Sequence, residues 1–449
     1  MKNIKNIVVF IYLSVGTLIY SEGAEKSKWP PPPNFKNRIN YVNWYQNNLN
    51  LTEKDNAVNY YKLFFQTGKH ERPNFLAPSD PNVDKQIEFI ISNAKEWEPN
   101  EYPILNKYLE GLSPYITAYE RGSHCKYFSF HINDRPKNIL EIRLPHTGNS
   151  AVISKAIIVK ALLKNNKGEP SNYIDAINTV FRHTKHIEQG ISMVEKLASV
   201  KERSLVYESI LMAVNRKEIY LFDLSKFKDS IFENDNVDLR EILIDGLSFT
   251  QACDYEILQD MCLPFPLLGG PRFNYKKVRY WHSYLFPHSS KNNQEDIYEN
   301  IKHENPLQIA KYIRSCYDDN IRIIKSPFES NYKMLFAQLE DIYKDKSPYF
   351  RFFFSSNLSG VYTYFMNVER NRRLAHLSIF LLDYHYNKKQ FPEKTILNAS
   401  QELRNVITDP LTGKPFEYVQ GINDCKIVCE KIGDFESKII CLNPCNNPN

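Results

Sequence analysis

The stretch AVISKAIIVKALLKNNKGEPSNYIDAINTVFRHTKHIE, residues 151–188, carries the clearest fold signal in the chain. Apolar residues recur at three- and four-residue steps on both sides of the segment NNKGEP, which is typical of helices with one buried face. Gly168 and Pro170 end the first helix, and Ser171 is a suitable cap for the second. The stretch therefore predicts two helices joined by a short polar turn, an αα-hairpin.

Similar apolar stripes continue outward from this hairpin. We expect further helices within residues 41–66, 102–119, 187–198, 221–231, 239–247, 295–317, 332–343 and, longest of all, 361–387. No fixed repeat period links them, so the pattern does not match a named solenoid. The sequence predicts a mostly α protein, an irregular array of stacked αα-hairpins, with a small C-terminal antiparallel β element.

The chain has 449 residues, more than one hydrophobic core usually organises, so two or three lobes are expected. The predicted regions are a signal peptide at 1–23, a Pro-rich spacer at 24–34, an N-terminal helical region at 35–150, central helical hairpins at 151–262, a junction with further helices at 263–350, and a long helix with a Cys-rich β-hairpin at 351–449.

The N-terminus has the three parts of a secretory signal peptide. Lys2 and Lys5 precede an apolar run at residues 7–20, and small residues at Ser21 and Gly23 favour cleavage after Gly23. The run is shorter than the roughly 20 residues that a membrane-spanning helix needs. We therefore expect a secreted or periplasmic protein with no membrane span in the mature chain.

Four consecutive prolines, Pro30 to Pro33, follow the predicted cleavage site. Their fixed φ angles favour an extended polyproline conformation. We interpret the run as a stiff spacer between the membrane-facing end and the folded body. The alternative is a ligand for a proline-binding module.

Composition excludes several function classes. The net charge of +5 is small for this length and predicts no nucleic-acid partner. Glycine is scarce, at 15 residues, and the sequence contains neither G-x-G-x-x-G nor G-x-x-x-x-G-K-[ST], which excludes Rossmann and P-loop folds. H-E-x-x-H and G-x-S-x-G are also missing from the sequence. No cofactor is predicted.

Four of the eight cysteines, Cys425, Cys429, Cys441 and Cys445, lie near the C-terminus. In an exported protein we expect two disulfides across a hairpin, Cys425 with Cys445 and Cys429 with Cys441. The alternative is a four-thiolate zinc site, although structural zinc prefers a two-residue gap within each pair, so no metal is predicted. The pairing of the remaining cysteines stays open: Cys125, Cys253, Cys262 and Cys316.

Two further clusters contain side chains suited to binding a metal or another ligand. His183, His186 and Glu188 lie on one predicted helix face, where a metal site competes with the simpler interpretation of solvated or backbone-bonded histidines. Residues 272–282 interleave cationic and aromatic side chains, which suits either a ligand surface or a junction with buried aromatics and outward cations. The candidate ligand surface comprises Arg272, Tyr275, Lys276, Lys277, Tyr280, Trp281 and His282.

The C-terminal region carries a resemblance to a known family. The segments HLSIFLLDYHYNKKQFP at 376–392 and ITDPLTGKPFEY at 407–418 resemble the globular end of type II secretion pseudopilins. The same pattern closes a broad group of large, functionally uncharacterised, exported helical bacterial proteins, whereas the N-terminus lacks a prepilin cleavage sequence. The resemblance implies export and a helix that ends between Lys388 and Pro392, then a tight turn over residues 409–418 that leads into a small antiparallel sheet. It supplies no activity.

Two functions from different classes are consistent with these observations. The first is an exported, non-catalytic envelope or assembly protein whose helical surface binds a protein partner in the cell envelope or in an extracellular assembly. The alternative is a helical hydrolase acting on envelope polysaccharide, which requires a desolvated glutamate in a cleft beside Trp281.

Overall fold

The computed structural model describes residues 28–49, 55–65, 76–93, 95–129, 136, 138–142, 144, 146–163, 171–215, 224–235, 237–263, 271–285, 299, 301–326, 358–399, 403, 406–421, 424–431 and 437–442. The predicted signal peptide, the helix expected at 332–343 and Cys445 lie outside these ranges.

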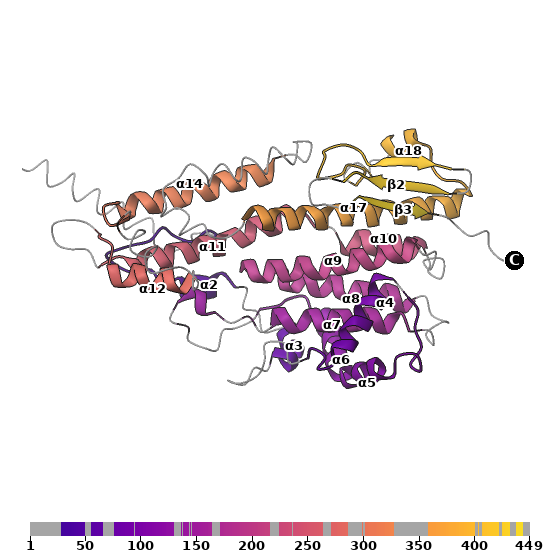
Figure 1. Ribbon diagram of the computed structural model, residues 1–449, viewed down its shortest axis with the longest axis horizontal. Coiled ribbons are helices and arrows are strands. Elements are labelled where there is room, and N and C mark those ends of the chain that lie inside the picture. The colour runs from indigo at the N-terminus through magenta and orange to yellow at the C-terminus, as the bar shows by residue number, and fades with distance from the viewer. Residues whose placement is uncertain are drawn as a thin grey trace, which may run out of the picture.

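Helices form most of the described structure (Figure 1). Their bounds are α2 Tyr41–Asn48, α3 Val58–Phe65, α4 Pro81–Ser92, α5 Pro103–Gly111, α6 Ser113–Ser123, the 3₁₀ turn η1 Ile139–Glu141, α7 His146–Ala161, α8 Ser171–Glu188, α9 Met193–Asn215, α10 Leu224–Asn234, α11 Leu239–Met261, α12 Tyr275–Leu285, α14 Pro306–Lys325, α17 Leu358–Lys388 and α18 Lys394–Ala399. A C-terminal sheet contains β1 Glu417–Gln420, β2 Cys425–Cys429 and β3 Lys438–Leu442. The predicted fold class is confirmed.

Helix α9 lies at the centre of the array and packs against α7, α8, α11 and α17. Several of these helices run along the long axis of the molecule, with α12 toward one end and the sheet toward the other (Figure 1). The buried apolar side chains form one cluster that extends from Phe35 to Leu442. Within the described residues the core is therefore continuous, whereas chain length predicts separate lobes. The core is continuous because the long helices α9 and α17 are shared between neighbouring layers.

Local sequence sets the helix starts. Asn305 caps α14 by accepting the N–H of Leu307, and Pro306 occupies the first turn, where no backbone donor is needed. Within and beyond the span expected to be helical at 295–317, α14 runs from Pro306 to Lys325. The hairpin at 151–188 is observed as α7 and α8, although α7 begins five residues earlier, at His146.

The C-terminal region follows the predicted path. Helix α17 ends at Lys388, and Lys389 takes a left-handed conformation with φ 59°. Asp409 begins a tight turn in which Gly413 has φ 67° and donates its N–H to the Asp409 carbonyl at 2.8 Å. The chain then enters β1 of an antiparallel sheet with the order β1-β2-β3. The predicted helix end, turn and sheet are confirmed.

The Pro-rich segment differs from the prediction of a spacer. Pro30 and Pro33 are buried, and the Tyr41 hydroxyl donates to the Pro31 carbonyl at 3.0 Å. The Gln259 side chain of α11 accepts the N–H groups of Asn34 at 3.3 Å and Ile39 at 3.0 Å, which lie on either side of the turn after the prolines. Because these contacts attach the segment to α11, its described part belongs to the folded body.

The predicted Cys429–Cys441 disulfide is wrong. The observed register places Cys429 opposite Lys438 and Cys441 opposite Lys426. Cys429 is buried on the inner face of the sheet, whereas Cys441 is exposed on the outer face, because successive side chains of a strand alternate. The described cysteines carry no disulfide: Cys125, Cys253, Cys262, Cys316, Cys425, Cys429 and Cys441. The Cys425–Cys445 pairing falls outside the described residues.

No described helix combines the length and the apolar character that crossing a membrane would require.

Candidate interaction surface at helix α12

Helix α12 is amphipathic, with one face fixed in the protein interior. The Asn274 side chain caps it by accepting the N–H groups of Lys276 at 3.0 Å and Lys277 at 3.4 Å. Val278, Trp281 and His282 recur at three- and four-residue steps and are all buried, with exposed fractions of 3% or less. Burying these side chains orients the opposite face of α12 outward.

Asp260 of α11 connects α12 to the N-terminal segment. Its carboxylate accepts hydrogen bonds from Trp281 Nε1 at 2.9 Å, Lys277 Nζ at 3.0 Å and Arg38 Nη1 at 3.1 Å. Burial alone would raise the pKa of Asp260, but these donors hold it below its ordinary value. The carboxylate therefore stays ionised and holds three segments of the chain together.

The outward face of α12 carries two exposed tyrosines. Tyr280 is 53% exposed and Tyr284 is 52% exposed, and their rings stack with centroids 6.3 Å apart and planes 23° apart. The buried Trp281 ring packs edge-on against both, with centroid distances of 5.4 Å to Tyr280 and 5.6 Å to Tyr284. Trp281 thus supports the two exposed rings from below.

Cationic side chains flank the tyrosines in a shallow hollow. We call this region the α12 surface, which is lined by Tyr275, Lys276, Arg279, Tyr280, Ser283 and Tyr284. Both charged residues in this lining are basic. The surface thus offers aromatic faces and positive charge together.

The structure divides the predicted ligand surface between two environments. Arg272, Lys276, Lys277 and Tyr280 are exposed and Tyr275 is half-buried, whereas Trp281 and His282 are buried. The interpretation of a junction with buried aromatics therefore holds for Trp281, whereas the ligand surface stays a prediction for the exposed residues. The sequence analysis included Arg279 in the stretch 272–282 but not in the candidate surface, and it missed Ser283 and Tyr284. Positions three and four residues from Lys276 and Tyr280 share their face of a helix.

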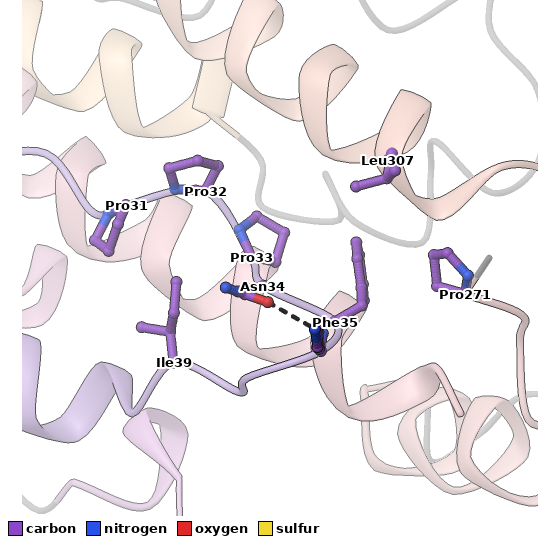
Figure 2. A pocket seen from close by; sticks show the side chains of 9 residues that line it. Pro31, Pro32, Pro33, Asn34, Phe35, Ile39, Pro271 and Leu307 are labelled. Atoms are coloured by element: carbon purple, nitrogen blue, oxygen red, sulfur yellow. Dashed lines mark hydrogen bonds between the residues drawn. The ribbon is translucent and has the colours of Figure 1, made fainter. Parts of the chain in front are cut away.

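A second hollow lies at the Pro-rich segment. Figure 2 shows this segment on one side and Leu307 of α14 with Pro271 on the other. We call it the Pro-rich groove, which is lined by Pro31, Pro32, Pro33, Asn34, Phe35, Lys36, Ile39, Pro271 and Leu307. Apolar side chains make up most of this lining.

The protein interior contains a different set of polar residues, centred on α9. Glu202 is 1% exposed and accepts hydrogen bonds from Ser150 Oγ at 2.7 Å, Ser154 Oγ at 2.7 Å and Tyr119 OH at 3.1 Å. His183 Nδ1 lies 3.1 Å from the same carboxylate. Burial alone would raise the pKa of Glu202, but His183 and the two serine hydroxyls hold it below its ordinary value.

Two other buried carboxylates, Glu195 and Asp235, are also surrounded by hydrogen-bond donors of the protein. Glu195 lies 3.0 Å from His146 Nε2 and also accepts the N–H and hydroxyl of Ser192. Asp235 accepts hydrogen bonds from Arg203 Nη1 at 2.6 Å and Tyr207 OH at 2.6 Å, and His376 Nε2 lies 2.7 Å away. The acceptor oxygens of these carboxylates are occupied by side chains of the protein itself, so they fix helix packing.

The residues of the His183 motif contact separate partners. His183 contacts Glu202, whereas His186 Nδ1 lies 2.9 Å from Tyr61 OH and its Nε2 lies 2.7 Å from the Cys125 carbonyl oxygen. Glu188 accepts a bidentate pair of hydrogen bonds from Arg203. The three side chains therefore do not converge on one point. Both histidines are buried rather than solvated, and the interpretation of a backbone-bonded histidine holds for His186.

Comparison with known proteins adds no family: no family model, curated protein or solved structure matches the chain.

Proposed function

We propose that this chain is an exported, non-catalytic protein whose α12 surface binds a protein partner in the cell envelope or in an extracellular assembly. The observation that carries the proposal is the supported pair of exposed tyrosines, Tyr280 and Tyr284, beside Lys276 and Arg279. Tyrosine and arginine are enriched at the energetic centres of protein interfaces.

Support from the protein interior strengthens this proposal. Binding normally costs free energy because exposed side chains lose rotamer freedom at the interface. Trp281 is held by its hydrogen bond to Asp260 and contacts both tyrosine rings. The rings are therefore ordered before a partner arrives, which reduces that cost.

A hydrolase acting on envelope polysaccharide has less support. General acid catalysis requires a protonated carboxyl within reach of an open substrate surface. The carboxylate that contacts Trp281 is Asp260, whose three donors hold its pKa low. Burial raises the pKa of Glu256 to about 7, but this side chain accepts the Ile139 N–H at 2.6 Å and lines neither of the two hollows described above.

Export is supported by the signal-peptide pattern at residues 1–23 and by the pseudopilin-like C-terminal segment. N-terminal sequencing of the mature protein from an extracytoplasmic fraction tests this part of the proposal. We expect the sequence to begin at Ala24. An intact Met1 recovered in the membrane fraction would contradict it.

Site-specific photo-cross-linking tests the interaction surface. A photoreactive amino acid would replace Tyr280 or Tyr284 in the full chain, expressed in the cells that encode it. Matched controls would carry it at two residues of similar exposure elsewhere, Tyr386 at 62% and Ile104 at 52%. We expect one defined protein adduct from positions 280 and 284 and none from the controls. Equal yields at all four positions, or no adduct at 280 and 284, would contradict the proposal.

A further inference from the structure

We infer that the Pro-rich groove and the α12 surface bind the same partner, and that the bound segment is acidic with an apolar side chain that enters the groove. This inference rests on the proposed function and adds the chemical class of the partner and a second contact region.

The groove is suited to an apolar side chain. Prolines and Phe35 form one wall, and Pro271 with Leu307 forms the other, so a side chain that entered between them would meet carbon atoms on both sides (Figure 2). Leu307 is 47% exposed, so part of its apolar surface is open to a partner. Covering such surface is favourable by roughly 25 cal/mol per Å².

The groove is also preformed. Proline rings fix the backbone of one wall, and hydrogen bonds attach that wall to the body at Tyr41 and Gln259. The Lys36 N–H donates to the Asn34 side chain at 3.0 Å, which holds the turn at the end of the proline run. A partner therefore meets a wall that is already ordered, as it does at Tyr280 and Tyr284.

The charges that line the two hollows have one sign. Within the described residues that line them, Lys36 is the charged residue of the groove, and Lys276 with Arg279 are those of the α12 surface. All three are exposed. Arg272, also exposed, lies in sequence between the two regions. An acidic segment complements this charge, whereas a basic segment is repelled by it.

The chain itself keeps the two regions close. Pro271 lines the groove and Tyr275 lines the α12 surface, and four residue steps separate them. At most ~3.6 Å per residue, the Cα atoms of Pro271 and Tyr275 lie within about 14 Å. An extended segment of four to six residues is long enough to contact both.

A peptide-binding measurement on the mature chain, residues 24–449, tests this inference. The probes are synthetic 12-residue peptides of four kinds: acidic with leucine and phenylalanine, basic with the same apolar residues, neutral with those residues, and acidic with serine in their place. Polygalacturonate and vesicles of phosphatidylglycerol are added as anionic probes of other classes. We expect the acidic apolar peptides to bind most tightly and to lose affinity as salt is raised.

Two variants locate the bound segment. The triple variant K36E/K276E/R279E should weaken binding of the acidic apolar peptide at least about tenfold. Its control, K85E/K107E/K394E, makes the same charge change at exposed lysines on other helices and should leave binding unchanged. Leu307→Ala should weaken binding of the acidic apolar peptide severalfold and leave binding of the acidic serine peptide unchanged. Circular dichroism and the thermal midpoint confirm that each variant is folded.

Several outcomes would overturn the inference: equal binding of basic and acidic peptides, equal losses in the two triple variants, or binding of polygalacturonate or vesicles without binding of acidic apolar peptides. The proposed function has a separate test. An adduct from positions 280 and 284, together with no preference for acidic apolar peptides, would refute the partner class and leave the proposed function intact.

Discussion

Helices α9 and α12 use similar residue types in opposite ways. On α9 the adjacent charged residues Glu202 and Arg203 are each 1% exposed or less and contact partners inside the molecule. On α12 the buried Trp281 supports Tyr280 and Tyr284, which remain exposed beside basic side chains. The neighbours of these side chains, rather than their residue types, therefore decide whether they are enclosed in the core or open to a partner.

The largest expected effect comes from removing an enclosed charge. Glu202→Ala removes the carboxylate that accepts from the Ser150, Ser154 and Tyr119 hydroxyls and that contacts His183. We expect the free energy of unfolding to fall by about 3–5 kcal/mol, measured by urea denaturation. Glu120→Ala, at an exposed position on α6, is the control and should change it by less than about 0.5 kcal/mol. Equal effects would show that the α9 cluster does not stabilise the fold.

The next effect concerns pH. Burial lowers the pKa of His186 from 6.5 to about 4, although the hydrogen bond between its Nε2 and the Cys125 carbonyl acts in the opposite direction. A lowered folded pKa contributes stability that is present above pH 6.5 and lost as pH falls toward 4. We expect a loss of roughly 3 kcal/mol over this range from His186. His186→Gln should flatten that slope, whereas the exposed control His303→Gln should keep it.

These interior contacts show what the sequence could predict. Periodicity predicted the α7–α8 hairpin and the long helix α17, and the pseudopilin-like segment at 407–418 predicted the turn at Asp409, because each depends on local sequence. It could not predict the pairs His183–Glu202 and His376–Asp235, since the latter joins residues 141 positions apart. Of the candidate ligand surface, the sequence identified Lys276 and Tyr280, while burial of Trp281 and His282 follows from the packing of α12 on α11.

The cysteine pairing failed for a related reason. A strand register decides which residues face each other, and a change of one position moves a side chain to the other face of the sheet. Spacing alone placed Cys429 beside Cys441, but the observed register sets Lys438 there.

A smaller pH effect is expected near the α12 region. Burial, with nearby Asp260 and Glu141, raises the pKa of Glu256 to about 7. A raised folded pKa contributes stability that is present below pH 4.5 and lost as pH rises through about 7. Glu256→Gln keeps an acceptor for the Ile139 N–H, so we expect the variant to exceed the native protein in stability at pH 8. Because Glu256 is only half-buried, solvent screening reduces the expected difference to roughly 2 kcal/mol. Thermal unfolding at pH 5 and pH 8 measures this difference, and an advantage that is equal at both values would refute the titration.

The smallest effect on stability is expected at the exposed face of α12. The double variant Y280A/Y284A removes rings that are about half exposed, and we expect the free energy of unfolding to change by no more than about 1 kcal/mol. A loss of several kcal/mol in urea denaturation would instead assign the two rings to the core and remove the contrast with α9.

The dissociation constant of the cross-linked partner for Y280A/Y284A, compared with that for the exposed-tyrosine control Tyr386→Ala, shows whether α12 forms the binding surface. We predict that the double variant, although folded, weakens binding at least about thirtyfold, because truncating a central interface tyrosine costs about 2 kcal/mol or more. The control should bind as the native protein does. Dissociation constants that agree for the native protein and both variants would contradict the assignment of α12 as the binding surface.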